Sequence, residues 1–125
     1  MLQGLVGRWK VIGCQLHGKW LPHSIFKEFI YIINADGSFD IEWSNLTYPD
    51  FQGGFPKSET GKLVFKDNHM DFIPDNGPFA GQALQGIFDL DHDILKANVA
   101  FAGNPRPEVF DAQQGEVYEI WQRLT

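Results

Sequence analysis

Apolar and polar residues alternate along this chain in short segments that are separated by turn residues. The alternation is strictest at 38–43, where Phe39, Ile41 and Trp43 stand between polar residues. A period of two places successive side chains on opposite faces of a β-strand, so that one face is apolar. Similar segments predict eight strands, at residues 7–15, 29–33, 38–43, 62–66, 69–73, 85–90, 94–100 and 116–124.

Turn residues join several of these strands directly. The segment 34–37 reads Asn-Ala-Asp-Gly, whose glycine suits the positive φ of a tight hairpin, and short turns follow at 67–68 and 91–93. The helical signal is limited to the region near 23–28, where Ser24 can cap one turn. Parallel strands need long crossover connections, which this pattern lacks. We therefore expect an all-β fold, an eight-stranded antiparallel up-and-down β-barrel with at most one short helix near residues 23–28.

Composition sets the size of this barrel and the character of its interior. A length of 125 residues suits a single domain, which we place at residues 1–125. Aromatic residues make up 14%, with 11 Phe and 4 Trp, and an eight-stranded barrel is either filled by side chains or holds one small ligand. The formal net charge of -6 opposes binding to phosphate backbones, so we expect no nucleic-acid partner.

Cysteine content and hydropathy indicate where the protein works. Cys14 is the single cysteine, so no disulfide can form within the chain, and a reducing cytoplasm is the expected compartment. No basic and apolar leader follows Met1, and the longest apolar runs, such as 29–33, are far shorter than the ~20 residues of a membrane helix. We expect a cytoplasmic protein without membrane insertion. The pattern leaves a homo-oligomer open.

Motifs for metal, cofactor or covalent chemistry are incomplete. The histidines show none of the short spacings typical of zinc ligands. Cys14 lies in the middle of a predicted strand, away from any helix N-terminus that would lower its pKa, and no Gly-x-Ser-x-Gly sequence supplies a nucleophile. We expect no metal site and no cofactor. The histidines are His17, His23, His69 and His92.

The candidates for ligand binding are side chains expected to face the interior, together with one cation. Pro105 and Pro107 flank Arg106 and stiffen its backbone, so its guanidinium could orient a carboxylate, phosphate or polarised carbonyl at the mouth of a pocket. The alternative role of Arg106 is to clamp its loop by pairing with backbone carbonyls or with Glu108. The expected ligand-binding residues are Tyr31, Phe39, Trp43, Phe65, Phe72, Phe88, Arg106 and Trp121.

Several ordered segments of the chain resemble one known group of barrels. They begin with Leu2-Gln3-Gly4 and Gly7-Arg8-Trp9-Lys10-Val11 and end with Gln122-Arg123. With these segments the chain resembles the lipocalin side of the calycin group, and more closely a family of short, mostly uncharacterised bacterial lipocalin-like domains. The other matching segments are Gly18-Lys19-Trp20-Leu21-Pro22, Gly86-Ile87-Phe88-Asp89-Leu90 with Leu95-Lys96, and Arg106-Pro107-Glu108-Val109-Phe110.

This resemblance has consequences for architecture more than for activity. It implies an eight-stranded antiparallel barrel in which Trp9 and Arg123 stack at the closed end, with a pocket at the other end. Trp9 and Arg123 then serve barrel closure and not ligand binding. Lipocalin-like barrels include carriers, ligand sensors and a minority of enzymes, so the fold alone does not fix the function.

Three functions are compatible with such a barrel. The leading hypothesis is the binding of a small, largely apolar molecule, held by burial of apolar surface. The second is a cofactor-independent, metal-free isomerase or cyclase acting on a hydrophobic natural-product-like substrate, because holding reacting atoms in place lowers a barrier without a metal or nucleophile. The third is a filled barrel that docks another protein through loops at 44–58 and 101–115.

The second hypothesis needs an acid or base inside the barrel. The candidate groups are Tyr31, Glu42, His17 and Glu119. Glu42 conflicts with this role, because strict alternation at 38–43 places Glu42 outside if Trp43 faces inward. This conflict ranks catalysis below binding.

Overall fold

The structure is a computed structural model, and it describes residues 2–26, 29–42, 58–77 and 79–124. Trp43 and most of the loop predicted at 44–58 lie outside the described residues. The two helices in the described part of the chain are four residues long each, and neither could cross a membrane.

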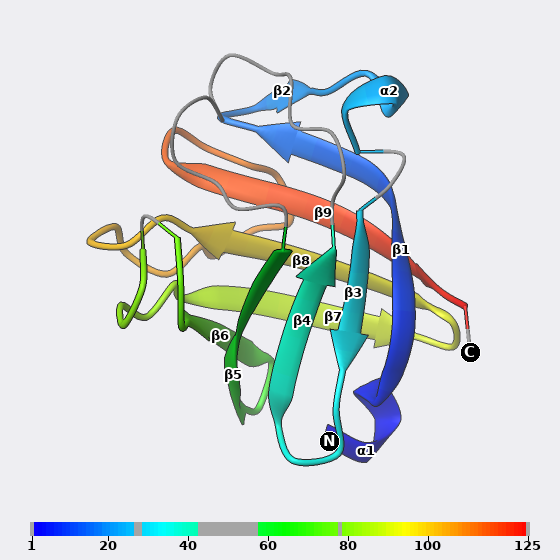
Figure 1. Cartoon of the computed structure of the whole chain (residues 1–125). Helices are drawn as coiled ribbons and strands as arrows, with labels where there is room; N and C mark the ends of the chain where they lie inside the picture. The colour runs from blue at the N-terminus through cyan, green and yellow to red at the C-terminus, as the bar shows by residue number, and fades with distance from the viewer. Residues whose placement is uncertain (1, 27–28, 43–57, 78, 125) are drawn as a thin grey trace.

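The strands form one antiparallel sheet that closes on itself (Figure 1). Each long strand pairs with the next along the chain, and the first pairs with the last, whereas the two-residue β2 pairs with the end of β1. This confirms the predicted eight-stranded antiparallel up-and-down barrel. The elements are α1 (Leu2–Leu5), β1 (Gly7–Leu16), β2 (Lys19–Trp20), α2 (His23–Phe26), β3 (Ile30–Ile33), β4 (Ser38–Glu42), β5 (Ser58–Lys66), β6 (His69–Pro74), β7 (Gly86–Asp91), β8 (Ile94–Ala100) and β9 (Glu116–Arg123).

Closure of the barrel rests on the pairing of β1 with β9. The register runs from Trp9 opposite Arg123 to Leu16 opposite Val117, and it shifts between Val11 and Gly13. A bulge inserts one residue into a strand, which changes the face on which the following side chains lie. The alternation predicted for 7–15 therefore changes phase here. As a result Cys14 and Leu16 join the buried core together with Val11.

The helix α1 covers one end of the barrel, which we call the base (Figure 1). Trp9 Nε1 donates a hydrogen bond to the carbonyl of Leu5 over 2.9 Å, and Arg123 Nη2 donates to the carbonyl of Gly4 over 2.6 Å. The guanidinium Cζ of Arg123 also lies 4.2 Å from the centroid of the Trp9 ring. Carbonyls at a helix end lack partners within the helix, and these two side chains supply them. The expected helix at 23–28 is present as α2, whereas α1 was not expected.

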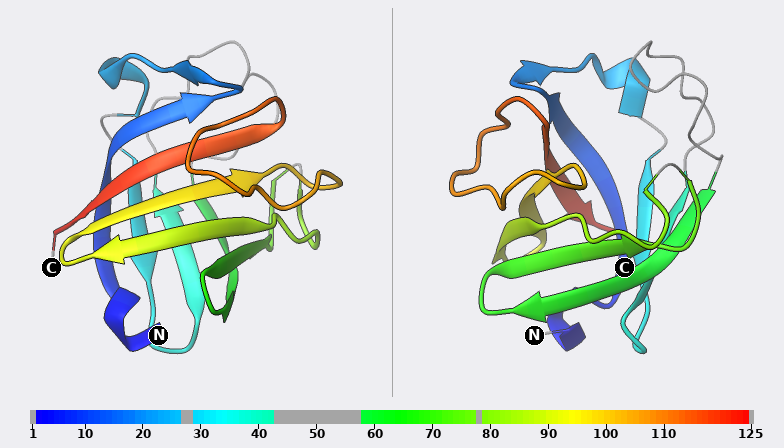
Figure 2. Two further views of the ribbon diagram at one scale, coloured as in Figure 1. Left: turned by 180° about the vertical axis from the view of Figure 1, so that it is seen from behind. Right: turned by 90° about the vertical axis from the view of Figure 1, so that its left-hand side faces the viewer.

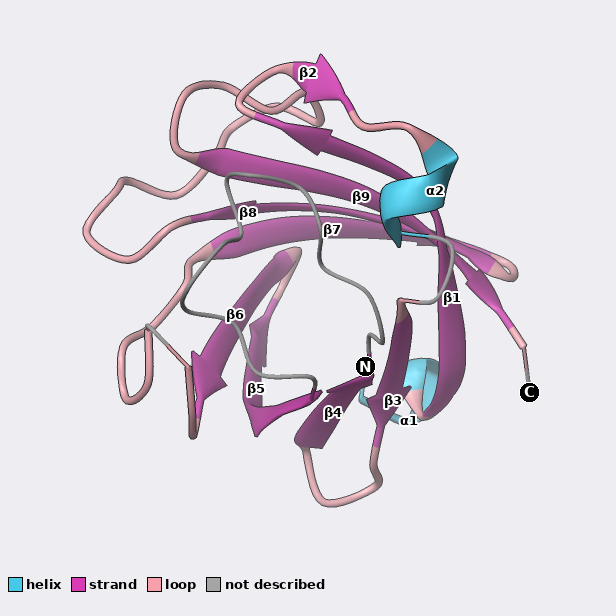
Figure 3. Ribbon diagram, turned by 45° about the horizontal axis from the view of Figure 1, so that its top comes forward, coloured by secondary structure: helices cyan, strands magenta, loops and turns pink. Residues whose placement is uncertain are grey.

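The opposite end of the barrel carries α2 (Figure 3). Phe26 of α2 and Phe29 after it are buried. Three apolar residues at this end of the neighbouring strands and loop are partly buried and pack against the core, namely Leu84, Val99 and Val117. We call this end the α2 end.

A long connection, residues 101–115, lies on the outside of the barrel over β8 and β9 (Figure 2). We call this segment the outer loop. The Asn98 side chain donates to the carbonyl of Val109 over 2.8 Å, and Gln15 Oε1 accepts the backbone N–H of Ala112 over 3.0 Å. These bonds come from the outward side chains of β8 and β1. The outer loop is therefore fastened to the barrel wall along its length.

Candidate functional site

A carboxyl group lies inside the barrel, on the last strand. Glu119 of β9 is buried, and it is paired in register with Cys14 of β1 and Ala97 of β8. Alternation along β9 places Glu119 on the same face as Trp121, which belongs to the buried core. Glu119 therefore stands among apolar side chains.

Two aromatic side chains bind this carboxyl at the same oxygen. The hydroxyl of Tyr31 donates to Glu119 Oε1 over 2.7 Å, and the indole Nε1 of Trp121 donates to Oε1 over 3.0 Å. The Tyr31 and Trp121 rings are stacked, with centroids 4.0 Å apart and planes inclined by 22°. Tyr31, Glu119 and Trp121 form what we call the interior carboxyl cluster. It joins β3 to β9 across β1.

The second oxygen of the Glu119 carboxyl, Oε2, differs from Oε1 in its hydrogen bonding. Among the residues the structure describes, no hydrogen bond reaches Glu119 Oε2. In the same part of the chain, Asn98 Oδ1 is the single fully buried side-chain polar atom without a partner. Glu119 as a residue keeps 8% of its surface exposed.

Burial controls the protonation of this cluster. Desolvation raises the pKa of the Glu119 carboxyl, and the hydrogen bonds from Tyr31 and Trp121 oppose the rise without reversing it. The pKa of the Cys14 thiol is raised first by desolvation and then by the negative charge of Glu119. Both effects favour the neutral forms, a carboxylic acid and a thiol. A neutral Cys14 is a poor nucleophile.

Aromatic rings surround the interior carboxyl cluster. Phe72 of β6 lies edge-on to both Tyr31 and Trp121, with centroids 6.1 and 6.4 Å away. Phe39 of β4 packs on Phe72 at 5.2 Å. The cluster thus sits in a wall of aromatic side chains, with the small side chain of Ala97 beside Glu119.

The structure brings together some of the predicted site residues. Tyr31 and Trp121 bond Glu119, Phe72 packs against both of these rings, and Phe39 packs against Phe72. Phe65 and Phe88 contact each other at 5.7 Å and belong to the same core.

Two of the four acid or base candidates lie away from this interior. Glu42 is exposed at the end of β4. His17 lies in the turn after β1, where its Nδ1 accepts the N–H of Gly115 over 2.9 Å and its ring packs edge-on against Phe101. The remaining pair, Tyr31 and Glu119, is hydrogen-bonded. Trp43 lies outside the described residues.

Arg106 lies on the outside of the barrel, at the seam between β6 and β7. These strands share one register pair, His69 with Ile87, and an isolated bridge at Phe72 and Leu84. Arg106 donates to both carboxylate oxygens of Asp71, over 2.5 and 3.1 Å, and to the carbonyl of Gly86 over 2.7 Å. The guanidinium thus ties the outer loop to both strands of the seam.

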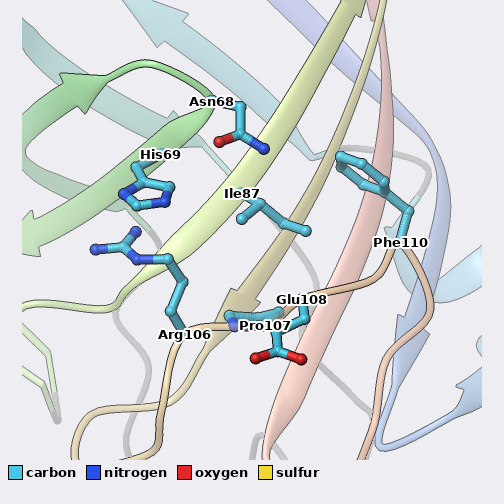
Figure 4. Close-up of a pocket in the computed structure, with 7 residues that line it drawn as sticks. All are labelled: Asn68, His69, Ile87, Arg106, Pro107, Glu108 and Phe110. Carbon is cyan, nitrogen blue, oxygen red and sulfur yellow. The ribbon is translucent and has the colours of Figure 1, made fainter.

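A surface pocket of about 400 Å³ lies beside this ion pair (Figure 4). Its walls combine the outer loop with the β5–β6 turn and the start of β6 and β7. The lining residues are Asn68, His69, Ile87, Arg106, Pro107, Glu108 and Phe110.

Two contacts were not identified from the sequence. Cys14 lies opposite Glu119 in the interior, and Asp71 is the ion-pair partner of Arg106. Cys14 faces inward because of the bulge in β1, which depends on pairing with β9. Asp71 alternates with the buried Met70 and Phe72 on β6, so its outward direction was readable from the pattern. The approach of Arg106 to Asp71 was not readable, because a long loop separates them.

The described residues were also considered as possible metal ligands. Among residues 2–26, 29–42, 58–77 and 79–124, no group of three or more His, Cys, Asp or Glu side chains could hold a metal ion. Comparison with known proteins gives no further assignment: no family model matches the chain, and no curated protein matches it.

Proposed function

We propose that this barrel binds a small, largely apolar molecule in its interior, as a lipocalin-like protein. The supporting observation is the interior carboxyl cluster, in which Glu119 Oε2 has no hydrogen bond from the described residues and aromatic rings pack around the carboxyl. Binding sites for small molecules are mostly apolar with a few placed polar groups. A buried carboxyl is costly for stability, so a role in binding accounts for its position.

Apolar contacts would provide most of the affinity. Burial of apolar surface contributes ~25 cal/mol per Å², from which the costs of association are subtracted. The aromatic side chains of Tyr31, Phe72 and Trp121 offer such surface around Glu119. The ligand would enter at the α2 end, where the core residues Leu84, Val99 and Val117 are partly exposed, because α1 covers the base.

The test is titration with N-phenyl-1-naphthylamine, a neutral apolar dye. The Trp20→Phe variant is used because Trp20 is 58% exposed, so that the remaining tryptophan emission reports mainly on Trp9, Trp43 and Trp121. We expect the dye to bind saturably, with rising dye emission and quenched tryptophan emission. A filled barrel gives neither change at any dye concentration, and that outcome rejects the proposal.

A matched pair of variants separates binding inside the barrel from binding on its surface. Ala97→Leu adds bulk on the inner face beside Glu119, whereas Lys96→Leu adds the same side chain on the exposed face of the same strand. We expect dye affinity to fall in Ala97→Leu and to stay unchanged in Lys96→Leu. Equal losses in the two variants would place the dye outside the barrel.

The hydrogen-bonded pair of Tyr31 and Glu119 favours a second candidate function, a metal-free isomerase or cyclase. A carboxylic acid inside an apolar site can give a proton to one carbon of a substrate, and the carboxylate that results can take a proton from another carbon, while the Tyr31 hydroxyl stays hydrogen-bonded to it. Shifting a double bond in this way moves one proton off carbon and one proton onto carbon, with no oxidant or reductant.

This candidate is tested with a β,γ-unsaturated ketone, whose conversion to the conjugated ketone is followed by ultraviolet absorbance. We expect the wild-type rate to exceed the uncatalysed rate and to be lost in Glu119→Gln, because an amide cannot release a proton. A wild-type rate equal to the buffer rate rejects isomerisation of this substrate class while leaving the binding proposal intact.

The filled-barrel alternative would act through the exterior instead. Trp20, Val109 and Phe110 are exposed apolar residues, and Trp20 and Phe110 both pack edge-on to Tyr118. Exposed apolar patches are typical of interaction surfaces. A dye-impermeable interior would move the functional assignment to this surface.

A further inference from the structure

We propose that Glu119 is the polar anchor of the barrel interior and donates a hydrogen bond from Oε2 to a neutral acceptor on the ligand, such as a ketone or aldehyde carbonyl oxygen. This inference rests on the proposed binding function. It adds the chemical class of the ligand, an apolar body that carries one carbonyl group.

The first step of the argument is the position of the proton. Oε1 already accepts hydrogen bonds from Tyr31 and Trp121. A protonated carboxyl carries its hydrogen on one oxygen and accepts with the other. Two donors on Oε1 therefore leave Oε2 as the oxygen that carries the hydrogen.

The second step is the charge of the group. The ion pairs that the structure describes are His92 with Asp91, Arg106 with Asp71, and Arg123 with Asp93, so no cation in the described residues neutralises Glu119. The titratable groups that face it are the Cys14 thiol and the Tyr31 hydroxyl. A buried carboxyl without a cation favours its neutral form, and a neutral acid is a donor.

The third step is the space around the donor. Glu119 as a residue is 8% exposed, and no hydrogen bond from the described residues reaches its Oε2. The residues paired with Glu119 on the neighbouring strands are Cys14 and Ala97, which have small side chains. Beyond Glu119 toward the base lie the fully buried Trp9 and Trp121. Glu119 thus stands at the deep end of the interior, where it would meet the polar end of a ligand.

The test uses three probes with the same naphthalene body, measured by titration calorimetry. They are 2-acetylnaphthalene, 2-ethylnaphthalene and 1-(2-naphthyl)ethylamine, which carry a carbonyl, a hydrocarbon and an ammonium group at the same place. We expect the ketone to bind about tenfold more tightly than the hydrocarbon, as one net hydrogen bond allows. We expect the amine to bind most weakly.

Two variants then identify the donor. Glu119→Gln keeps an oxygen that accepts from Tyr31 and Trp121 and places an amide N–H₂ at the position of Oε2, so we expect the preference for the ketone to persist. Glu119→Leu removes the donor, so ketone and hydrocarbon should bind equally. The carbonyl stretch of the bound ketone gives an independent readout, because a hydrogen bond lowers its infrared frequency in wild type and Glu119→Gln.

The outcomes separate this inference from the function on which it rests. Equal binding of ketone and hydrocarbon by the wild type, with an unshifted carbonyl stretch, overturns the anchor and preserves apolar binding. Tightest binding of the amine, lost in Glu119→Gln, overturns it in favour of a carboxylate that pairs with a cation. Absence of binding by all three probes rejects the binding function itself and the anchor with it.

Discussion

The hydroxyl of Tyr31 lies 2.7 Å from the carboxyl of Glu119, which joins two residues 88 positions apart in the sequence, on strands separated by β1 in the barrel. This contact is a polar link in an otherwise apolar interior. It brings a carboxyl, a phenol and an indole together in a buried region.

The stability of the protein should depend on pH through Glu119. Because its folded pKa is raised from 4.5, the folded state holds this proton at pH values where the unfolded chain has lost it. The stabilisation is complete below about pH 4.5 and is lost as pH rises through the folded pKa. We expect the Tm of the wild type, relative to that of Glu119→Gln, to fall with rising pH in this window.

This pH effect can be separated from that of the neighbouring thiol. Cys14 also has a raised pKa, from an ordinary value of 9.0, so its contribution is lost only in alkaline solution. Melting curves for wild type and Glu119→Gln between pH 4 and pH 8 therefore isolate the carboxyl. A constant difference in Tm across this range would show that Glu119 titrates normally.

Removal of the Tyr31 hydroxyl should destabilise the protein by about 1 kcal/mol, the net value of a buried hydrogen bond. Tyr31→Phe keeps the ring stacked on Trp121 and removes the bond to Oε1. Tyr118→Phe is the control, because no hydrogen bond of the Tyr118 hydroxyl occurs among the described residues. Urea unfolding measures both variants, and equal changes would mean that the Tyr31 bond contributes nothing specific.

Arg106 and Asp71 should be coupled energetically without affecting the interior. Their side chains are 22% and 19% exposed, and the guanidinium bonds both carboxylate oxygens. A double-mutant cycle with Arg106→Ala and Asp71→Ala should give a coupling of about 1–3 kcal/mol. Binding of N-phenyl-1-naphthylamine should be unchanged in the folded variants. A loss of dye affinity would instead assign Arg106 to the ligand site.

Arg123 should hold α1 against the base. Arg123→Lys keeps a positive charge near Trp9 but loses the fork that reaches the carbonyls of Gly4 and Val6. We expect faster amide hydrogen exchange near the N-terminus in this variant, with the exchange of β5 and β6 unchanged. Uniform acceleration in all strands would mean that Arg123 supports the whole barrel and not α1 in particular.

Cys14 should resist thiol reagents in the native protein. It is buried, and its pKa is raised by burial and by Glu119, so little thiolate forms. We expect no reaction with Ellman's reagent over hours at neutral pH and full reaction in denaturant. Rapid native labelling would show that the interior opens far more than the structure indicates.

The sequence predicted the strands well where one face of a strand is apolar. Phe39 and Ile41 alternate with polar residues and do form β4. The first residues of β5 were missed, because 58–61 carries no apolar alternation and is ordered by its pairing with β4. The helix α1 was missed for a similar reason, since Arg123 holds it from the other end of the chain while Trp9 bonds it from β1.

The candidate site was only partly readable from the sequence. Tyr31 and Glu119 were chosen by residue type, and their contact follows from closure of the barrel. His17 and Glu42 were chosen on the same grounds, but a turn and an exposed strand end keep them apart from the interior. Residue type thus identifies candidate acid or base groups, whereas the order of strands around the barrel determines which of these groups come into contact.

The pairing of β1 with β9 bears on how the protein is made. During synthesis on the ribosome, β1 emerges before β9, so the edge of β1 that pairs with β9 stays unpaired until β9 has been translated. Such distant pairing slows folding and leaves an edge open to other chains. We therefore expect the edge of β1 to stay available to other chains until β9 has been translated.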